Sequence, residues 1–186
     1  MSASDGSQDW VEAGFDALAE GGVDRVRVEV LAQMLGVTKG GFYRRFRDRP
    51  ALLAAMLETW AEGRIAAIRQ QTALDGETPH ERLRLLIRLF SERPNARGLS
   101  IELAVRQWAR SDAQAAAAVT RVDAIRLERV TDLYARLGYP PARAKARGLI
   151  IYAYIFGQGL LLPEASHAER EALARACMDE LIPVEG

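Results

Sequence analysis

From Val28 to Leu53 the chain reads VEVLAQMLGVTKGGFYRRFRDRPALL, and this stretch sets the architecture of the N-terminal part. Apolar residues at helical spacing predict a short helix over residues 28–35. Gly36 should end that helix, because glycine readily adopts the left-handed conformation that closes a helix. Thr38 is a suitable N-cap for a second short helix. Two short helices joined by a tight turn form a helix-turn-helix, in which the second helix enters the major groove of DNA.

The second helix of this motif should have one buried and one exposed face. Ala32 is small enough for the close contact between the two helices, and the side chains expected beneath the motif are those of Leu31, Leu35, Val37 and Phe46. The residues expected to face outward are Thr38, Lys39, Gly40, Gly41, Tyr43 and Arg44. A glycine within a helix costs roughly 1 kcal/mol against alanine, so two glycines in so short a helix indicate a surface that another molecule approaches closely.

The charges of the chain are unevenly distributed, although 25 basic and 25 acidic side chains give a formal net charge of zero. Residues 22–50 hold seven basic side chains against three acidic ones. Residues 1–21 hold five acidic side chains and no basic one, so no basic arm precedes the motif. A basic cluster on a neutral chain predicts a confined DNA-binding surface.

Helical periodicity continues along the rest of the chain, and no segment alternates as a half-buried strand would. In addition to the two helices of the motif, helices are predicted over residues 10–21, 50–71, 83–90, 99–109, 112–137, 141–162 and 165–182. The sequence therefore predicts an all-α fold of about nine helices. A three-helix domain with the helix-turn-helix should cover residues 9–56, including the start of the fourth helix, and a larger helical domain should cover residues 57–186.

Several classes of function are disfavoured. Cys177 is the only cysteine, which excludes an intrachain disulfide and a cysteine-based zinc cluster within one chain. No HExxH, GxSxG, GxGxxG or Walker phosphate loop is found, so we expect no enzyme, no cofactor and no metal. The apolar run over residues 149–162 is shorter than the roughly 20 residues of a membrane-spanning helix. The polar N-terminal segment has no features of a signal peptide, and we expect a cytoplasmic protein without a membrane partner.

Residues 10–60 resemble the TetR family of tetracycline-repressor-like regulators. The resemblance rests on residues 13–15, 20–22, 28–37 and 38–53. It implies that the second helix of the motif reads DNA, and that a tyrosine there and a basic residue at the start of the next helix contact phosphates. By position these are Tyr43 and Arg49. Independently of the family, a tyrosine hydroxyl and an arginine at a helix N-terminus are suited to phosphate.

Further DNA contacts follow from the same resemblance. Thr38, Lys39 and Gly40 fall where the family reads bases or adjacent phosphates. Arg45 replaces a frequent histidine and can keep its phosphate contact. Arg27 stands where Ser or Thr usually caps the first helix of the motif, which weakens that cap but offers a guanidinium to phosphate. The full set of predicted DNA-binding residues is Arg27, Thr38, Lys39, Gly40, Gly41, Tyr43, Arg44, Arg45 and Arg49.

The second half of the chain resembles the C-terminal regulatory domain of one branch of this family. The resemblance rests on residues 106–112, 121–123 and 144–157. It implies a pocket for a small-molecule effector, and pairing with a second copy through the last two helices. The pocket candidates are Phe90, Arg106, Trp108, Tyr134, Tyr152 and Phe156. The candidates for the dimer interface are Ile150, Tyr154, Gly157, Leu161, Leu173, Cys177 and Leu181.

These C-terminal assignments have simpler alternatives. Aromatic residues at helical spacing more often pack in a core than line a cavity. Arg106 and Gln107 more often lie on an exposed helix face, or bond to a neighbouring helix, than hold a ligand.

Together the sequence features favour a transcriptional repressor that binds a palindromic operator in double-stranded DNA as a homodimer and is released by a small molecule. Its two reading helices would have to lie about 34–36 Å apart to enter successive major grooves. The alternative is a dimeric module of the same fold that binds a ligand or a protein and has weak or lost DNA binding, as the zero net charge suggests.

Overall fold

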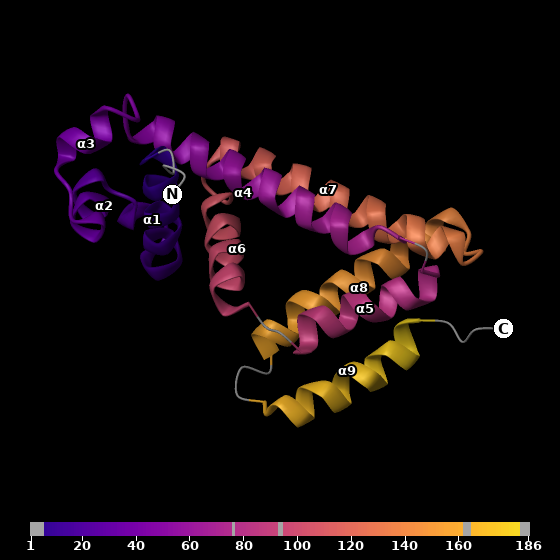
Figure 1. The fold of residues 1–186 in the computed structure, drawn as a ribbon. Helices are drawn as coiled ribbons and strands as arrows, with labels where there is room; N and C mark the ends of the chain where they lie inside the picture. Colours follow the sequence, from indigo (N-terminus) through magenta and orange to yellow (C-terminus); the bar gives the residue numbers. More distant parts are fainter. Residues whose placement is uncertain (1–5, 76, 93–94, 162–164, 183–186) are drawn as a thin grey trace. The chain divides into compact units, whose positions relative to one another are not determined.

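The computed structural model describes residues 6–75, 77–92, 95–161 and 165–182, without the side chains of residues 90–92 and 158–161. Within these residues the chain forms nine α-helices, one 3₁₀ turn and no strand, so the all-α prediction is confirmed (Figure 1). The elements are α1 (Gly6–Gly21), η1 (Val23–Arg25), α2 (Val28–Leu35), α3 (Lys39–Tyr43), α4 (Arg49–Thr72), α5 (Pro79–Glu92), α6 (Ala96–Trp108), α7 (Ala113–Arg136), α8 (Pro141–Leu161) and α9 (His167–Leu181). None of the described helices has the length and apolarity that a bilayer crossing requires.

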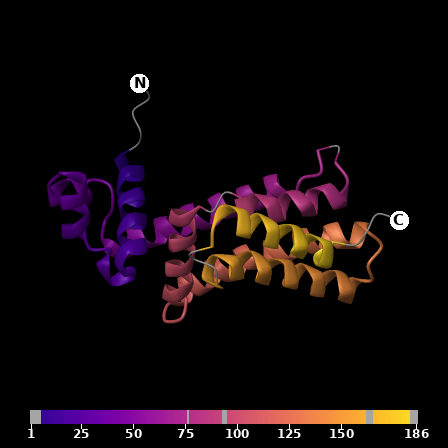
Figure 2. The same ribbon diagram turned by 90° about the horizontal axis from the view of Figure 1, so that it is seen from below.

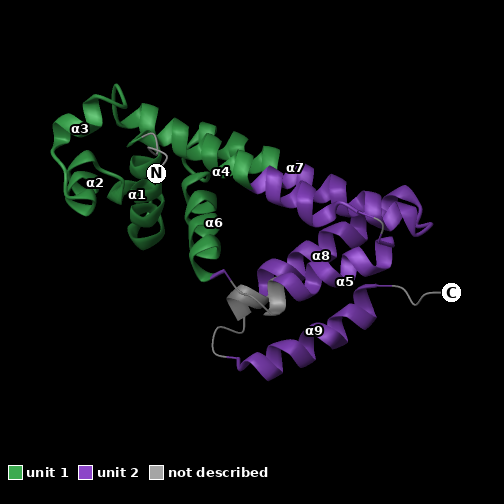
Figure 3. Cartoon of the chain, in the orientation of Figure 1, with its two compact units in different colours: residues 1–63, 96–122 green, residues 64–95, 123–186 purple. Residues whose placement is uncertain are grey.

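The chain divides into two compact units (Figure 3). Unit 1 consists of residues 1–63 and 96–122, and unit 2 consists of residues 64–95 and 123–186. Unit 1 therefore contains the whole of the predicted N-terminal domain, residues 9–56, and adds α6 and the first part of α7.

Three of the predicted helix boundaries are confirmed by their hydrogen bonds. Gly36 ends α2 in the left-handed conformation, with φ 66°, and its N–H bonds to carbonyl oxygens of the last turn. Asp48 caps α4, since its Oδ1 accepts from the N–H of Ala51 at 2.8 Å. Asp112 caps α7 in the same way, accepting from Ala115 at 2.9 Å. These short polar side chains bind backbone N–H groups that the first helical turn leaves without a partner.

Other boundaries differ from the prediction because the helices begin in polar turns. The helix α1 begins at Gly6, four residues before the first apolar position. The helix α5 begins at Pro79, behind a capping box in which Thr78 and Glu81 bond to each other's backbone N–H groups at 3.2 and 2.7 Å. Ser166 and Glu169 form the same motif before α9. Apolar periodicity carries no signal from such turns, whereas the capping-box spacing does.

The core of unit 1 is built on aromatic contacts and one close helix crossing. The Phe42 side chain is fully buried. Its ring packs edge-on against Trp10, with centroids 5.3 Å apart, and stacks with Phe46 at 5.6 Å. At Gly14 a Cβ atom would lie 2.6 Å from the sulfur of Met56, so a larger residue on α1 would require the buried Met56 side chain of α4 to shift.

The prediction for the side chains beneath the helix-turn-helix is wrong at one position. Leu31 and Phe46 are buried as expected, and Leu35 is partly buried, but Val37 is 48% exposed. The reason is the left-handed turn at Gly36, after which the N–H of Val37 bonds back to the carbonyl of Ala32 at 3.0 Å. Val37 therefore belongs to the outer surface of the turn.

Unit 2 contains the last part of α4, the second part of α7, and the helices α5, α8 and α9 (Figure 2). A hydrophobic cluster in this unit is formed by the buried residues Leu83, Leu86, Ile87, Val130, Leu133, Tyr134, Ala144, Ile151, Ala174 and Ile182. The hydroxyl of Tyr134 donates to the carbonyl of Leu181 at 2.8 Å, and Arg147 donates to the same oxygen at 3.2 Å. Burial raises the pKa of Tyr134 to about 12, so the phenol stays protonated and keeps its donor. These two bonds fix the C-terminal end of α9 to α7 and α8.

We expect Tyr134→Phe to lower the free energy of unfolding by about 1 kcal/mol, because it removes one hydrogen bond and keeps the ring. Arg147 still donates to the Leu181 carbonyl, which limits the loss. Equilibrium urea denaturation measures the change. Tyr43→Phe is the matched control, since the Tyr43 side chain is exposed and its hydroxyl should not contribute. An unchanged Tyr134→Phe midpoint would contradict the anchoring of α9.

Candidate functional site

The exposed face of α3 is held outward by the burial of its opposite face. Phe42 is fully buried while the next residue, Tyr43, is 62% exposed. The two aromatic rings are nearly perpendicular, with centroids 5.2 Å apart. Of the predicted DNA-binding residues, the exposed ones are Arg27, Thr38, Lys39, Gly40, Tyr43, Arg44 and Arg45, and the partly buried ones are Gly41 and Arg49. Most of the set is therefore exposed on α3 or near it in the sequence, and its DNA contacts stay a prediction.

The two glycines of α3 are not required by packing within the chain. A Cβ atom on Gly40 would meet only the Thr38 hydroxyl, at 3.6 Å. A Cβ atom on Gly41 would lie 3.7 Å from the Trp10 ring and 3.9 Å from a methyl of Val37, which are ordinary contact distances. Neither glycine has a positive φ angle. The chain itself therefore gives no reason for glycine at these positions, which is consistent with close approach by another molecule.

Lys39 has a partner within the chain that sequence reasoning missed. Its ammonium group donates to Glu29 of α2 at 2.7 Å, and both side chains are more than half exposed. This hydrogen bond lowers the pKa of Glu29 below its usual value. A phosphate or base that binds Lys39 must therefore compete with a carboxylate. Glu29 lies ten residues before Lys39 in the sequence. Only its place on the neighbouring helix could have indicated this contact from the sequence.

The arginines after α3 differ in their surroundings. Arg49 is partly buried and donates through Nε and Nη2 to the carbonyls of Val26 and Val23, both at 2.6 Å. Arg47 was not among the predicted site residues, yet its side chain is 86% exposed and its Nε donates to Asp48 at 2.9 Å. Of the two arginines beside Asp48, Arg47 is therefore the exposed one. The four arginines within residues 44–49 were the sequence feature that could have indicated Arg47 as a site residue.

Each unit holds only part of the predicted ligand-pocket set. Arg106 and Trp108 belong to unit 1, where Arg106 pairs with the buried carboxylate of Glu102 at 2.9 Å. Unit 2 contains Tyr134, which is fully buried, and also Tyr152 and Phe156, which are partly buried. The Phe156 ring lies under the guanidinium of Arg126, with 5.2 Å to the centroid. The Phe90 side chain lies outside the described residues.

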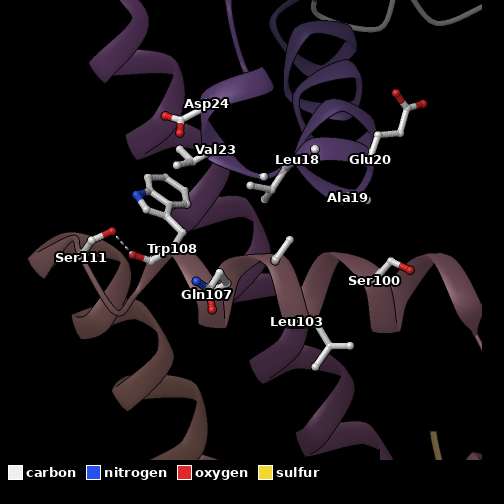
Figure 4. A pocket seen from close by; sticks show the side chains of 13 residues that line it. Leu18, Ala19, Glu20, Val23, Asp24, Ser100, Leu103, Gln107, Trp108 and Ser111 are labelled. Atoms are coloured by element: carbon white, nitrogen blue, oxygen red, sulfur yellow. Dashed lines mark hydrogen bonds between the residues drawn. The ribbon is translucent and has the colours of Figure 1, made fainter. Parts of the chain in front are cut away.

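Two surface hollows, each of about 540 Å³, are found among the described residues. The first lies in unit 1 between the end of α1, η1 and one face of α6, and Trp108 is the one predicted pocket residue that lines it (Figure 4). The second lies in unit 2 between α5 and α9. Its lining residues are Arg84, Arg88, Glu171, Ala174, Arg175, Met178 and Asp179.

The predicted dimer residues fall into two groups. Ile150 on α8 and Leu173 on α9 are 51% and 41% exposed, and the neighbouring Leu149 is 64% exposed. Tyr154 and Leu181 instead pack against the core of unit 2. Gly157 and Cys177 are partly buried, and the Leu161 side chain lies outside the described residues. Exposed leucine and isoleucine on neighbouring helices are consistent with an apolar surface that a second chain covers.

Comparison with known proteins relates the N-terminal part to a family of regulators. Residues 11–56 match the family of bacterial regulatory proteins, tetR family. Over 91 residues the chain is 34% identical to the transcriptional regulator AcuR of Cereibacter sphaeroides, a match that covers 48% of this chain and 41% of that protein. The chain thus spans less than half of the length of this curated relative.

Solved structures share the fold over nearly the whole chain. A transcriptional regulator from Rhodococcus sp. Rha1 aligns with TM-score 0.74 and 18% identity, covering 94% of this chain and 93% of that one. A TetR transcription regulator from Haloarcula marismortui aligns with TM-score 0.72 and 20% identity, covering 96% of both chains. The regulator FadR from Bacillus subtilis, solved with stearoyl-CoA, aligns with TM-score 0.69 and 16% identity, covering 96% of this chain and 99% of FadR.

We expect Gly40→Ala to keep or slightly raise the free energy of unfolding, by up to roughly 1 kcal/mol, because alanine favours the helix and its Cβ fits. The same variant should bind duplex DNA more weakly than the wild type, since the added methyl faces outward. Urea denaturation and fluorescence polarisation with a labelled duplex measure the two effects. A variant that is less stable than the wild type would instead mean that the chain's own packing requires this glycine.

Proposed function

Because the chain belongs to the tetR family of bacterial regulatory proteins and carries its DNA-binding domain, we propose that this transcriptional regulator is a ligand-released repressor of a palindromic operator. The surface around α3 carries the proposal. Its tyrosine and basic side chains are exposed on a helix whose buried face is fixed by Phe42. Such a helix can enter a major groove without rearrangement of its own core.

A palindromic operator requires two copies of α3 in a fixed relation. Successive major grooves on one face of the duplex are separated by about 34–36 Å, and a symmetric dimer can present two helices at that distance. The exposed apolar residues of α8 and α9, Leu149, Ile150 and Leu173, support pairing of two chains through these helices. The homodimer is therefore part of the proposal.

Release by a ligand needs contacts that pass a displacement to the DNA-binding helices. Within unit 1, Arg97 of α6 donates to Asp16 at 2.8 Å and to Glu12 at 2.9 Å, both on α1. Arg121 of α7 binds Glu58 and Glu62 of α4 at 3.0 and 3.4 Å. Each guanidinium thus bridges two carboxylates one helical turn apart.

These two bridges support a mechanical route for release. A ligand that prefers a state with α6 or α7 displaced would pull on α1 and α4, and so change the placement of α3. A preference of a few kcal/mol is enough to shift the population. FadR, which shares the fold, was solved with stearoyl-CoA.

One observation favours the alternative, a dimeric ligand-binding or protein-binding module with weak DNA binding. Lys39 and Arg49 are both engaged within the chain, so part of the basic cluster is neutralised or occupied. Titration of the protein with the DNA that flanks its own gene, at two salt concentrations, separates the two functions. Saturable binding that weakens steeply with salt supports the repressor. Binding no tighter than that to random duplex at either concentration supports the alternative.

We expect Tyr43→Ala to weaken binding to specific and random duplexes by a similar factor, because a phosphate contact carries no sequence information. Fluorescence polarisation with both duplexes measures the factor, and thermal unfolding confirms that the variant is folded. Leu85→Ala is the control. It removes an exposed side chain on a different helix, α5, and should bind like the wild type. Wild-type affinity of Tyr43→Ala would remove this residue from the site.

We expect Ile150→Glu to weaken self-association by at least tenfold, because it places a charge in the proposed apolar interface. Sedimentation velocity over a range of protein concentrations measures the dissociation constant. Leu85→Glu, at a residue that is also exposed but lies on α5, is the control and should leave the dimer intact. If both variants, or neither, dissociate, α8 does not form the interface.

A further inference from the structure

Two arginines flank the Asp48 cap of α4, and the structure gives them opposite surroundings. Arg47 is 86% exposed, whereas Arg49 is partly buried with two of its nitrogens bonded to backbone carbonyls. Both carry the same charge and lie two residues apart. The two arginines therefore differ in their burial and in their hydrogen-bond partners, and not in their charge.

The Arg49 guanidinium joins two segments that are distant in the sequence. It lies in the first turn of α4 and donates to Val26 and Val23 in the connection between α1 and α2, at 2.6 Å each. The Val26 side chain is fully buried, so this connection is part of the core of unit 1. A planar guanidinium can donate two hydrogen bonds at once to carbonyls that would otherwise need other partners. Arg49 thus fixes the start of α2 to α4, and with it the frame that carries α3.

The Arg47 guanidinium is oriented by the same residue that caps α4. Asp48 accepts from the Ala51 N–H through Oδ1 and from Arg47 Nε through Oδ2. Both bonds lower the pKa of Asp48, so this carboxylate stays charged. With Nε held, the end of the exposed Arg47 side chain can bind a phosphate with two parallel N–H groups. The adjacent N-terminus of α4 adds a favourable field for an anion.

We propose that Arg47 contacts a DNA phosphate, and that Arg49 is a positioning residue that holds the α1–α2 connection to α4. This moves to Arg47, which had no predicted role, the phosphate contact that the family resemblance implied for Arg49. The Arg47 half rests on the proposed function. The Arg49 half concerns the fold of unit 1 and does not depend on DNA.

The test compares how binding to a random-sequence duplex depends on KCl concentration for Arg47→Ala, Arg49→Ala and Arg143→Ala. The slope of log K against log salt counts phosphate contacts, and each lost contact lowers its magnitude by about one. We expect Arg47→Ala to lower the slope by about one per subunit and to keep the wild-type unfolding temperature. Arg143→Ala removes an exposed charge on α8 and should change neither quantity.

The Arg49 variants should give the opposite pattern. Arg49→Ala should unfold several degrees below the wild type and, measured below that temperature, keep the wild-type salt slope. Arg49→Lys keeps the charge but loses the planar guanidinium, so its unfolding temperature should also lie below that of the wild type. Arg47→Lys keeps a cation for the phosphate, so it should bind DNA like the wild type. If Arg49→Ala does not fold, Arg49→Lys replaces it in both measurements.

Three results would overturn the proposal. A salt slope lowered by Arg49→Ala or Arg49→Lys would make Arg49 a phosphate contact. An unchanged unfolding temperature in both variants would remove its positioning role, and an unchanged slope in Arg47→Ala would remove the Arg47 contact. If the wild type binds no duplex even at low salt, the proposed function and the Arg47 half fail together, and thermal unfolding still decides the Arg49 half.

Discussion

The burial of Phe42 is the constraint on which the exposed surface around α3 depends. The helix α3 is only five residues long, and an isolated helix of that length does not hold its conformation in water. The contacts of the Phe42 ring with Trp10 and Phe46 replace the missing helical stability with packing. Because the ring occupies one face of α3, Tyr43 and its neighbours are left on the other. One apolar side chain thereby fixes which polar side chains face outward.

The acidic N-terminal segment and the zero net charge also have a structural explanation. Within unit 1, Glu12 and Asp16 of α1 bind Arg97, and Glu20 binds Arg25 at 2.9 Å. These carboxylates therefore hold helices of the same unit together. The exposed basic side chains of unit 1 include four on or just after α3, namely Lys39, Arg44, Arg45 and Arg47. Local charge at this surface, and not the sum over the chain, governs its attraction for an anion.

The parts of the structure that depend on local sequence could be predicted, and those that depend on distant partners could not. Gly36 and Asp48 mark helix ends by their own conformational and hydrogen-bonding preferences, and the all-α fold follows from periodicity. The role of Arg49 depends on carbonyls 23 and 26 residues away from it in the sequence. Likewise, Arg97 lies 81 residues from its partner Asp16, and no short-range pattern assigns α6 to unit 1.

The ion pair between Lys39 and Glu29 has a consequence for how the surface distinguishes one duplex from another. Any nucleic acid that engages the Lys39 ammonium meets a carboxylate that already lies 2.7 Å from it. A duplex site whose phosphates or bases bind Lys39 no more strongly than Glu29 does gains no affinity from this lysine. In the proposed function, Glu29 would therefore reduce what Lys39 contributes to binding, and least at sites where a base edge or a well-placed phosphate outcompetes the carboxylate.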